Sequence, residues 1–178
     1  MILYHTGTVE LKEPDIHYGR KNADFGQGFY LTSESDFALR WSSERKNTFN
    51  TYELDLNSLR IHRFIRSEEW LSYIFRNRRG KADSLKADVV IGPIANDTLF
   101  DTFGIISSGF LTDKQALQLL MLGPEYTQVA IKTKKAAEQL VWISAREISM
   151  EEADQYRQSV KLEEDAYWRA IGAAIDSF

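Results

Sequence analysis

Residues 25–32 read Phe25-Gly26-Gln27-Gly28-Phe29-Tyr30-Leu31-Thr32: two glycines bracket one polar residue, and an aromatic pair then leads into an apolar run typical of a strand. Glycines at alternate positions let a backbone pass close to a ligand, or adopt a positive φ, where a Cβ would clash. A tyrosine just after such a turn can lay its ring on a bound planar group. This stretch is therefore suited to a close approach of the backbone to a ligand, but a Gly-x-Gly segment alone is a weak signal.

Two neighbouring segments extend the pattern. The chain begins Met1-Ile2-Leu3-Tyr4-His5-Thr6-Gly7, an apolar strand that ends in a histidine followed by small residues. Downstream, Ser33-Glu34-Ser35-Asp36 predicts a helix start, with Ser33 as N-cap and Asp36 in the first turn. We expect this helix to span residues 34–47 and to carry Trp41.

Taken together, His5, the Gly26-Gln27-Gly28-Phe29-Tyr30 segment and Trp41 resemble the ADP-ribosyltransferase superfamily, in the histidine–tyrosine branch that contains diphtheria toxin and the poly-ADP-ribose polymerases. The match in order and spacing covers residues 1–45. The whole chain also resembles a small uncharacterised bacterial domain family within this superfamily, through residues 24–30, the Val90–Ala95 segment and a late strand that contains a glutamine. Members of that family often lie beside a short partner gene, as in toxin–antitoxin pairs.

This resemblance implies an activity and a set of roles. The expected protein is a mono-ADP-ribosyltransferase that uses NAD as substrate, modifies a macromolecular target and is held by a small antitoxin protein. His5 would hydrogen-bond a ribose hydroxyl, the backbone at Thr6 would bind the carboxamide of nicotinamide, and Tyr30 and Trp41 would stack on its ring. An electron-rich aromatic face attracts the cationic pyridinium. The implied catalytic residues are His5, Tyr30 and Gln128, and the implied NAD-binding residues are His5, Thr6, Gly7, Gly26, Gly28, Phe29, Tyr30 and Trp41.

Gln128 is where the chain departs from the superfamily pattern. Active members usually carry a glutamate on the matching strand, which stabilises the positive charge that develops on the ribose. Glutamine can orient a ribose by hydrogen bonds but supplies no negative charge. Three alternatives stay open: the family works with glutamine, another carboxylate such as Glu125 or Asp97 replaces the glutamate, or the domain binds NAD or ADP-ribose without turnover. A plain NAD glycohydrolase would share the same site, and RNA 2′-phosphotransferase chemistry would need several arginines there.

Composition sets the broader limits. The chain has 178 residues, no cysteine and a net charge of −4, which disfavours broad binding to a nucleic-acid backbone and excludes disulfides and thiolate metal sites. His17, His62, Glu10 and Glu13 lack metal-ligand spacing, so no metal site is expected. We find neither a signal peptide nor a membrane span in the sequence and expect a cytoplasmic protein.

Alternation and apolar periodicity predict an α+β fold, for which the resemblance implies a split antiparallel sheet core with flanking helices. We expect the ADP-ribosyltransferase-like domain at 1–148 and, at 149–178, an amphipathic helix that covers the sheet, or else binds a partner. Thr112 with Gln115 predicts a capping box that opens a helix at 112–121. The basic run at 76–81 is interpreted as a solvated helix end before a phosphate-contacting patch, and Asp24 as a loop-stabilising residue before a ribose contact.

Overall fold

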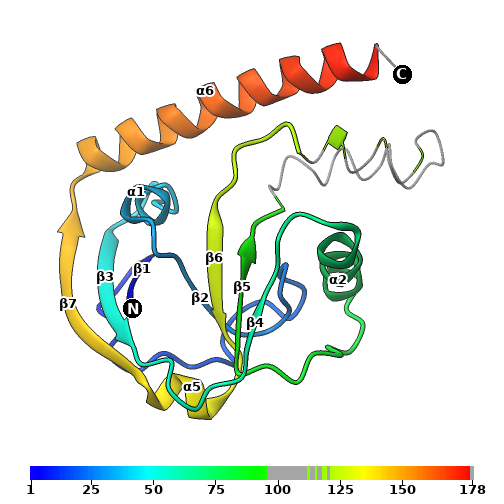
Figure 1. The fold of residues 1–178 in the computed structure, drawn as a ribbon. Helices are drawn as coiled ribbons and strands as arrows, with labels where there is room; N and C mark the ends of the chain where they lie inside the picture. The colour runs from blue at the N-terminus through cyan, green and yellow to red at the C-terminus, as the bar shows by residue number, and fades with distance from the viewer. Residues whose placement is uncertain (96–111, 113–114, 116–117, 120, 177–178) are drawn as a thin grey trace.

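A computed structural model describes residues 1–95, 112, 115, 118–119 and 121–176. Two sheets form its centre, and helices lie around them (Figure 1). The fold is therefore α+β, as the sequence predicts. Within the described residues, no helix is both long and apolar enough to cross a membrane.

The first sheet is antiparallel, with the strand order β1-β3-β7. Its strands are β1 (Ile2–Gly7), β3 (Asn47–Leu54) and β7 (Leu140–Ile148). The second sheet has the order β2-β6-β5-β4, antiparallel except for the parallel pair β4 and β5. Its strands are β2 (Phe29–Leu31), β4 (Ile61–Arg63), β5 (Val89–Pro93) and β6 (Thr127–Ile131).

Two core clusters hold these layers. One lies between the sheets and contains Leu3, Leu31, Tyr52 and Val129. The other packs the second sheet against helix α2 (Glu68–Arg78), through Trp70 among others. Helix α5 (Lys134–Glu138) is capped by Thr133 and leads into β7.

The C-terminal helix α6 (Met150–Ile175) runs across one end of both sheets (Figure 1). Ser149 caps it by accepting from the Glu152 N–H. Its buried Tyr167 and Ile171 join the core of the second sheet, whereas Ala153 packs with Phe49 of the first. The helix thus packs against the core residues of both sheets.

The predicted length of the helix at 34–47 is wrong. Helix α1 covers only Ser35–Leu39, and its N-cap is Glu34, without a side-chain cap, rather than Ser33. Polar side chains compete for the backbone beyond it: Ser42 Oγ donates to Leu39 O at 2.6 Å, and the Asn47 amide bonds the backbone of Ser43 and Arg45. Trp41 consequently lies in the turn after α1, and residue 47 already begins β3.

The expected capping box is confirmed, because Thr112 and Gln115 exchange side-chain and backbone hydrogen bonds. Most of the helix expected at 112–121 lies outside the described residues, and so does Asp97, the carboxylate considered as a replacement for the glutamate.

Candidate functional site

The two sheets separate beside His5, where a side-chain hydrogen bond replaces the next backbone pairing. Tyr4 and Thr32 exchange two backbone hydrogen bonds of 2.8 and 3.0 Å, which join β1 to the end of β2. Continued in the same register, the next pair would be Thr6 with Tyr30. Instead the Tyr30 carbonyl pairs with His5 Nδ1 at 2.8 Å. The imidazole is thus bonded to the Tyr30 carbonyl, which would accept from the Thr6 N–H if the two strands stayed paired.

This arrangement fixes the protonation of His5. A carbonyl oxygen can only accept, so Nδ1 carries the proton and Nε2 keeps a lone pair. Burial lowers the pKa of His5, and the hydrogen bond to the carbonyl only partly opposes that effect, so the ring is neutral at pH 7. A Cβ on Gly7 would lie 3.2 Å from Nε2, and glycine therefore leaves space beside that atom. His5 presents a hydrogen-bond acceptor that suits a hydroxyl group.

The backbone of Thr6 faces the gap between the sheets. Peptide groups alternate sides along an antiparallel strand, so the Thr6 N–H and C=O point to the same side as those of Tyr4, toward β2. Among the described residues they meet no backbone partner there, and the buried Thr6 Oγ1 has no hydrogen-bond partner either. The N–H and C=O of one residue, side by side on a strand edge, match the acceptor and donor of a primary amide.

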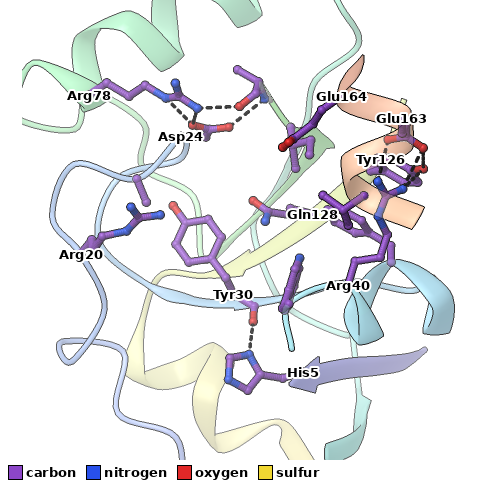
Figure 2. A pocket seen from close by; sticks show the side chains of 16 residues that line it. His5, Arg20, Asp24, Tyr30, Arg40, Arg78, Tyr126, Gln128, Glu163 and Glu164 are labelled. Atoms are coloured by element: carbon purple, nitrogen blue, oxygen red, sulfur yellow. Dashed lines mark hydrogen bonds and ion pairs between the residues drawn. The ribbon is translucent and has the colours of Figure 1, made fainter. Parts of the chain in front are cut away.

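A cavity of about 450 Å³ opens at this junction, and Figure 2 shows the side chains around it. His5, Tyr30, Trp41 and Gln128 all line it, so the structure brings together these four sequence-predicted residues. Thr6, Gly7, Gly26, Gly28 and Phe29 lie outside its lining. The Trp41 ring stands edge-on to His5, with centroids 5.8 Å apart.

The two glycines of the 25–32 stretch serve the chain's own backbone. Gly26 has a φ of +74°, and a Cβ on Gly28 would lie 2.7 Å from the Ile131 carbonyl on β6. The Tyr30 hydroxyl closes this turn by donating to Gly26 O at 2.6 Å and accepting from the Phe25 N–H at 3.0 Å. Burial raises the pKa of Tyr30, so the phenol stays protonated. Its hydroxyl is occupied in the turn, and its ring is the part offered to the cavity.

Asp24 and Arg78 form a buried pair at the cavity wall, with side-chain exposures of 9% and 5%. Arg78 also donates to Ala95 O at 2.6 Å, while Asp24 accepts from the Ala95 N–H at 2.8 Å (Figure 2). The loop-stabilising role expected of Asp24 is therefore confirmed. The interpretation of the whole basic run as solvated is wrong for Arg78, because the last turn of α2 points it inward; Arg76, Arg79 and Lys81 are exposed.

Helix α6 supplies cavity residues that the sequence analysis missed: Val160, Glu163 and Glu164. Arg40 donates to both Glu163 oxygens, at 2.9 and 2.7 Å, and Tyr126 donates to Glu163 Oε2 at 2.6 Å. Arg40 also bonds the Tyr126 hydroxyl, and the Tyr126 ring stacks on Phe37 with centroids 4.5 Å apart. The apolar period of 149–178 marks the packing face of α6 but gives no sign that its acidic residues reach a site on β1 and β2.

Comparisons with known proteins give one family. The chain belongs to the family described as "Protein of unknown function (DUF3990)", whose model matches residues 1–142. No curated protein and no solved structure matches the chain. The matched segment includes β1, β2 and Gln128 but ends before α6. Among the described residues, no group of three or more histidine, aspartate or glutamate side chains is placed to hold a metal ion.

Proposed function

We propose that this protein is an NAD-dependent mono-ADP-ribosyltransferase acting on a macromolecular target, with an ADP-ribosyltransferase-like split-sheet fold. The observation that carries the proposal is the junction of the sheets, where a neutral His5, the Tyr30 ring and Trp41 line one cavity, and where the neighbouring Thr6 N–H and C=O have no backbone partner among the described residues. The toxin role and the small antitoxin partner belong to the same proposal and rest on the resemblance in sequence.

Each part of nicotinamide riboside finds a chemical counterpart here. His5 Nε2 accepts from a ribose hydroxyl, while the Thr6 C=O and N–H bind the carboxamide. The Tyr30 and Trp41 rings line the same cavity and suit a flat cationic ring. Cleavage of the glycosidic bond builds positive charge on the ribose, as in glycoside hydrolysis. Gln128 orients the sugar on β6 without adding charge.

Two competing functions use the same site. A binding module for NAD or ADP-ribose is favoured by Gln128, since it lacks the charge that accelerates cleavage. RNA 2′-phosphotransferase chemistry is favoured by the arginines at the cavity, Arg20, Arg40 and Arg78. It is opposed by the ion pairs that already engage Arg40 with Glu163 and Arg78 with Asp24.

The test is incubation of the purified protein with isotopically labelled NAD and bacterial lysate, followed by quantification of free nicotinamide and of label on macromolecules. Nicotinamide release with label on a macromolecule supports the transferase. Release without such label supports a glycohydrolase, and binding without release supports the binding module.

The site assignment is tested by three variants in the same assay. We expect His5→Ala and Tyr30→Ala each to lower release by about 100-fold or more, because each removes a contact to the reacting nucleoside. His17→Ala, at an exposed histidine outside the cavity lining, is the matched control and keeps wild-type release. Unchanged release in both site variants refutes the site.

A further inference from the structure

We propose that Glu164 of α6 is a catalytic carboxylate that supplies, from outside the sheet, the negative charge that Gln128 lacks. This inference rests on the proposed function and adds a catalytic residue to it. Glu164 lines the cavity together with His5, Tyr30 and Gln128. Figure 2 shows its side chain leaving α6 and pointing toward the cavity, between Asp24 and Gln128.

The carboxylates around the cavity differ in how they are engaged. Asp24 is buried against Arg78, and Glu163 is held by Arg40 and Tyr126. Glu164 forms no hydrogen bond or ion pair with any residue in the described part of the chain. Glu125, considered from the sequence, lies outside the cavity lining, 57% exposed and 3.8 Å from Arg66. Of these four carboxylates, Glu164 alone lines the cavity and has no hydrogen-bond or ion-pair partner among the described residues.

The neighbouring residue fixes where Glu164 points. Successive residues on a helix are about 100° apart, so the rotation of α6 that brings Glu163 onto Arg40 also sets the direction of Glu164. The two charged hydrogen bonds from Arg40 and the bond from Tyr126 make that rotation well defined. Glu163 is thus a positioning residue, and Glu164 is the group that faces the substrate.

The proposed step balances without another reagent. The bond between ribose C1′ and the pyridinium nitrogen breaks, and its electron pair leaves with neutral nicotinamide. Glu164 stabilises the positive charge that develops on the ribose. A lone pair of the acceptor then forms the new bond to C1′, and the acceptor proton passes to Glu164 and on to water.

The experiment compares nicotinamide release by wild type, Glu164→Gln and Asp165→Asn, with NAD binding and thermal melting measured on each protein. Glu164→Gln keeps the size of the side chain and removes its charge. We expect its kcat to fall by about 100-fold or more, while KM for NAD changes by less than about 3-fold. Asp165→Asn removes a charge from the exposed position next to it and keeps the wild-type rate.

A second variant separates charge from structure. Adding Gln128→Glu to Glu164→Gln returns a carboxylate to the cavity from β6, and we expect at least about 10-fold recovery of kcat. A purely structural role of Glu164 would give no such recovery. If wild type releases nicotinamide and Glu164→Gln does so equally well, this inference is overturned and the proposed function stands. If wild type releases none, both are overturned.

Discussion

At the scale of single residues, the candidate site depends on one hydrogen bond: the Tyr30 carbonyl accepts from a side chain and not from the backbone of Thr6. His5 Nδ1 donates to the Tyr30 carbonyl, while His5 Nε2 and the Thr6 N–H and C=O have no hydrogen-bond partner among the described residues. His5 and Thr6 are consecutive residues of β1, and Tyr30 faces them from β2. The pairing of these two strands therefore sets the relative placement of the three residues. Rigid placement of this kind keeps binding groups in position before a substrate arrives.

Gly7 offers a direct test of this arrangement. Gly7→Ala would place a methyl group 3.2 Å from His5 Nε2, closer than ordinary contact, so either the ring or the strand end must shift. We expect nicotinamide release to fall by roughly 10-fold to 100-fold, because small misplacements of a substrate contact have effects of that size. A steady-state assay beside a melting curve checks this. A variant that melts like wild type and turns over at the wild-type rate would contradict the role given to Nε2.

The sequence identified most of these residues but not the reasons for them. Gly26 and Gly28 were expected near a ligand, whereas Gly26 is required by its positive φ and Gly28 by the approach of Ile131. Tyr30 was expected to stack, and its hydroxyl also closes the turn from Gly26. Local spacing in the sequence indicates which residues are important, but the atoms through which each residue makes its contacts depend on strand register.

At the scale of elements, the connection between α1 and α6 holds the cavity together. Arg40, at the end of α1, bonds Glu163 on α6 and the Tyr126 hydroxyl just before β6. The sequence predicted a long helix through Arg40 and Trp41, since nothing local reveals that Ser42 and Asn47 bind the backbone there. The early end of α1 is what turns Trp41 toward His5.

This connection predicts a defined dependence of stability on pH. Burial alone would raise the pKa of Glu163, but the hydrogen bonds from Arg40 and Tyr126 outweigh it and hold the pKa below its ordinary value of 4.5. The folded state therefore binds fewer protons than the unfolded state in this range. The stabilisation by Glu163 is complete above the ordinary value and is lost as the pH falls through the lower, folded value.

We expect Glu163→Gln to lose about 1 kcal/mol of unfolding free energy at pH 7, a modest value because the side chain is 30% exposed. The free energies of unfolding of wild type and variant, measured with denaturant, should become equal as the pH is lowered well below 4.5. Glu138→Gln, which removes the exposed pair with Lys134, is the control and should change stability by less than about 0.5 kcal/mol. A difference of equal size at acid pH would contradict the ionic origin of the effect.

At the scale of the whole molecule, the candidate site is completed by a helix beyond the segment that matches the family. The family model ends at residue 142, whereas Val160, Glu163 and Glu164 form part of the cavity wall. Apolar spacing identified this helix and its Tyr167 and Ile171. It could not indicate which face would meet the sheet junction, because that depends on how β7 delivers the chain to Ser149.

If α6 is integral to the domain, a substitution that weakens its packing must lower the free energy of unfolding of the whole domain. Ile171 is 2% exposed and shares a core cluster with Trp70 and Ile74 of α2. Ile171→Ala should therefore cost about 2–5 kcal/mol through lost burial and the cavity left behind. Leu162→Ala, at a side chain 70% exposed on the same helix, should cost less than about 0.5 kcal/mol.

The form of the transition tests the argument further. Because the core cluster of Ile171 extends to α2 and the second sheet, we expect one cooperative transition, with helical circular dichroism and tryptophan fluorescence changing together. In Ile171→Ala both signals should shift to lower denaturant and remain coincident. A loss of helical signal before the main change in fluorescence would mean that α6 detaches from a stable sheet core. The cavity wall formed by Glu163 and Glu164 would then be a removable cover instead of a fixed part of the site.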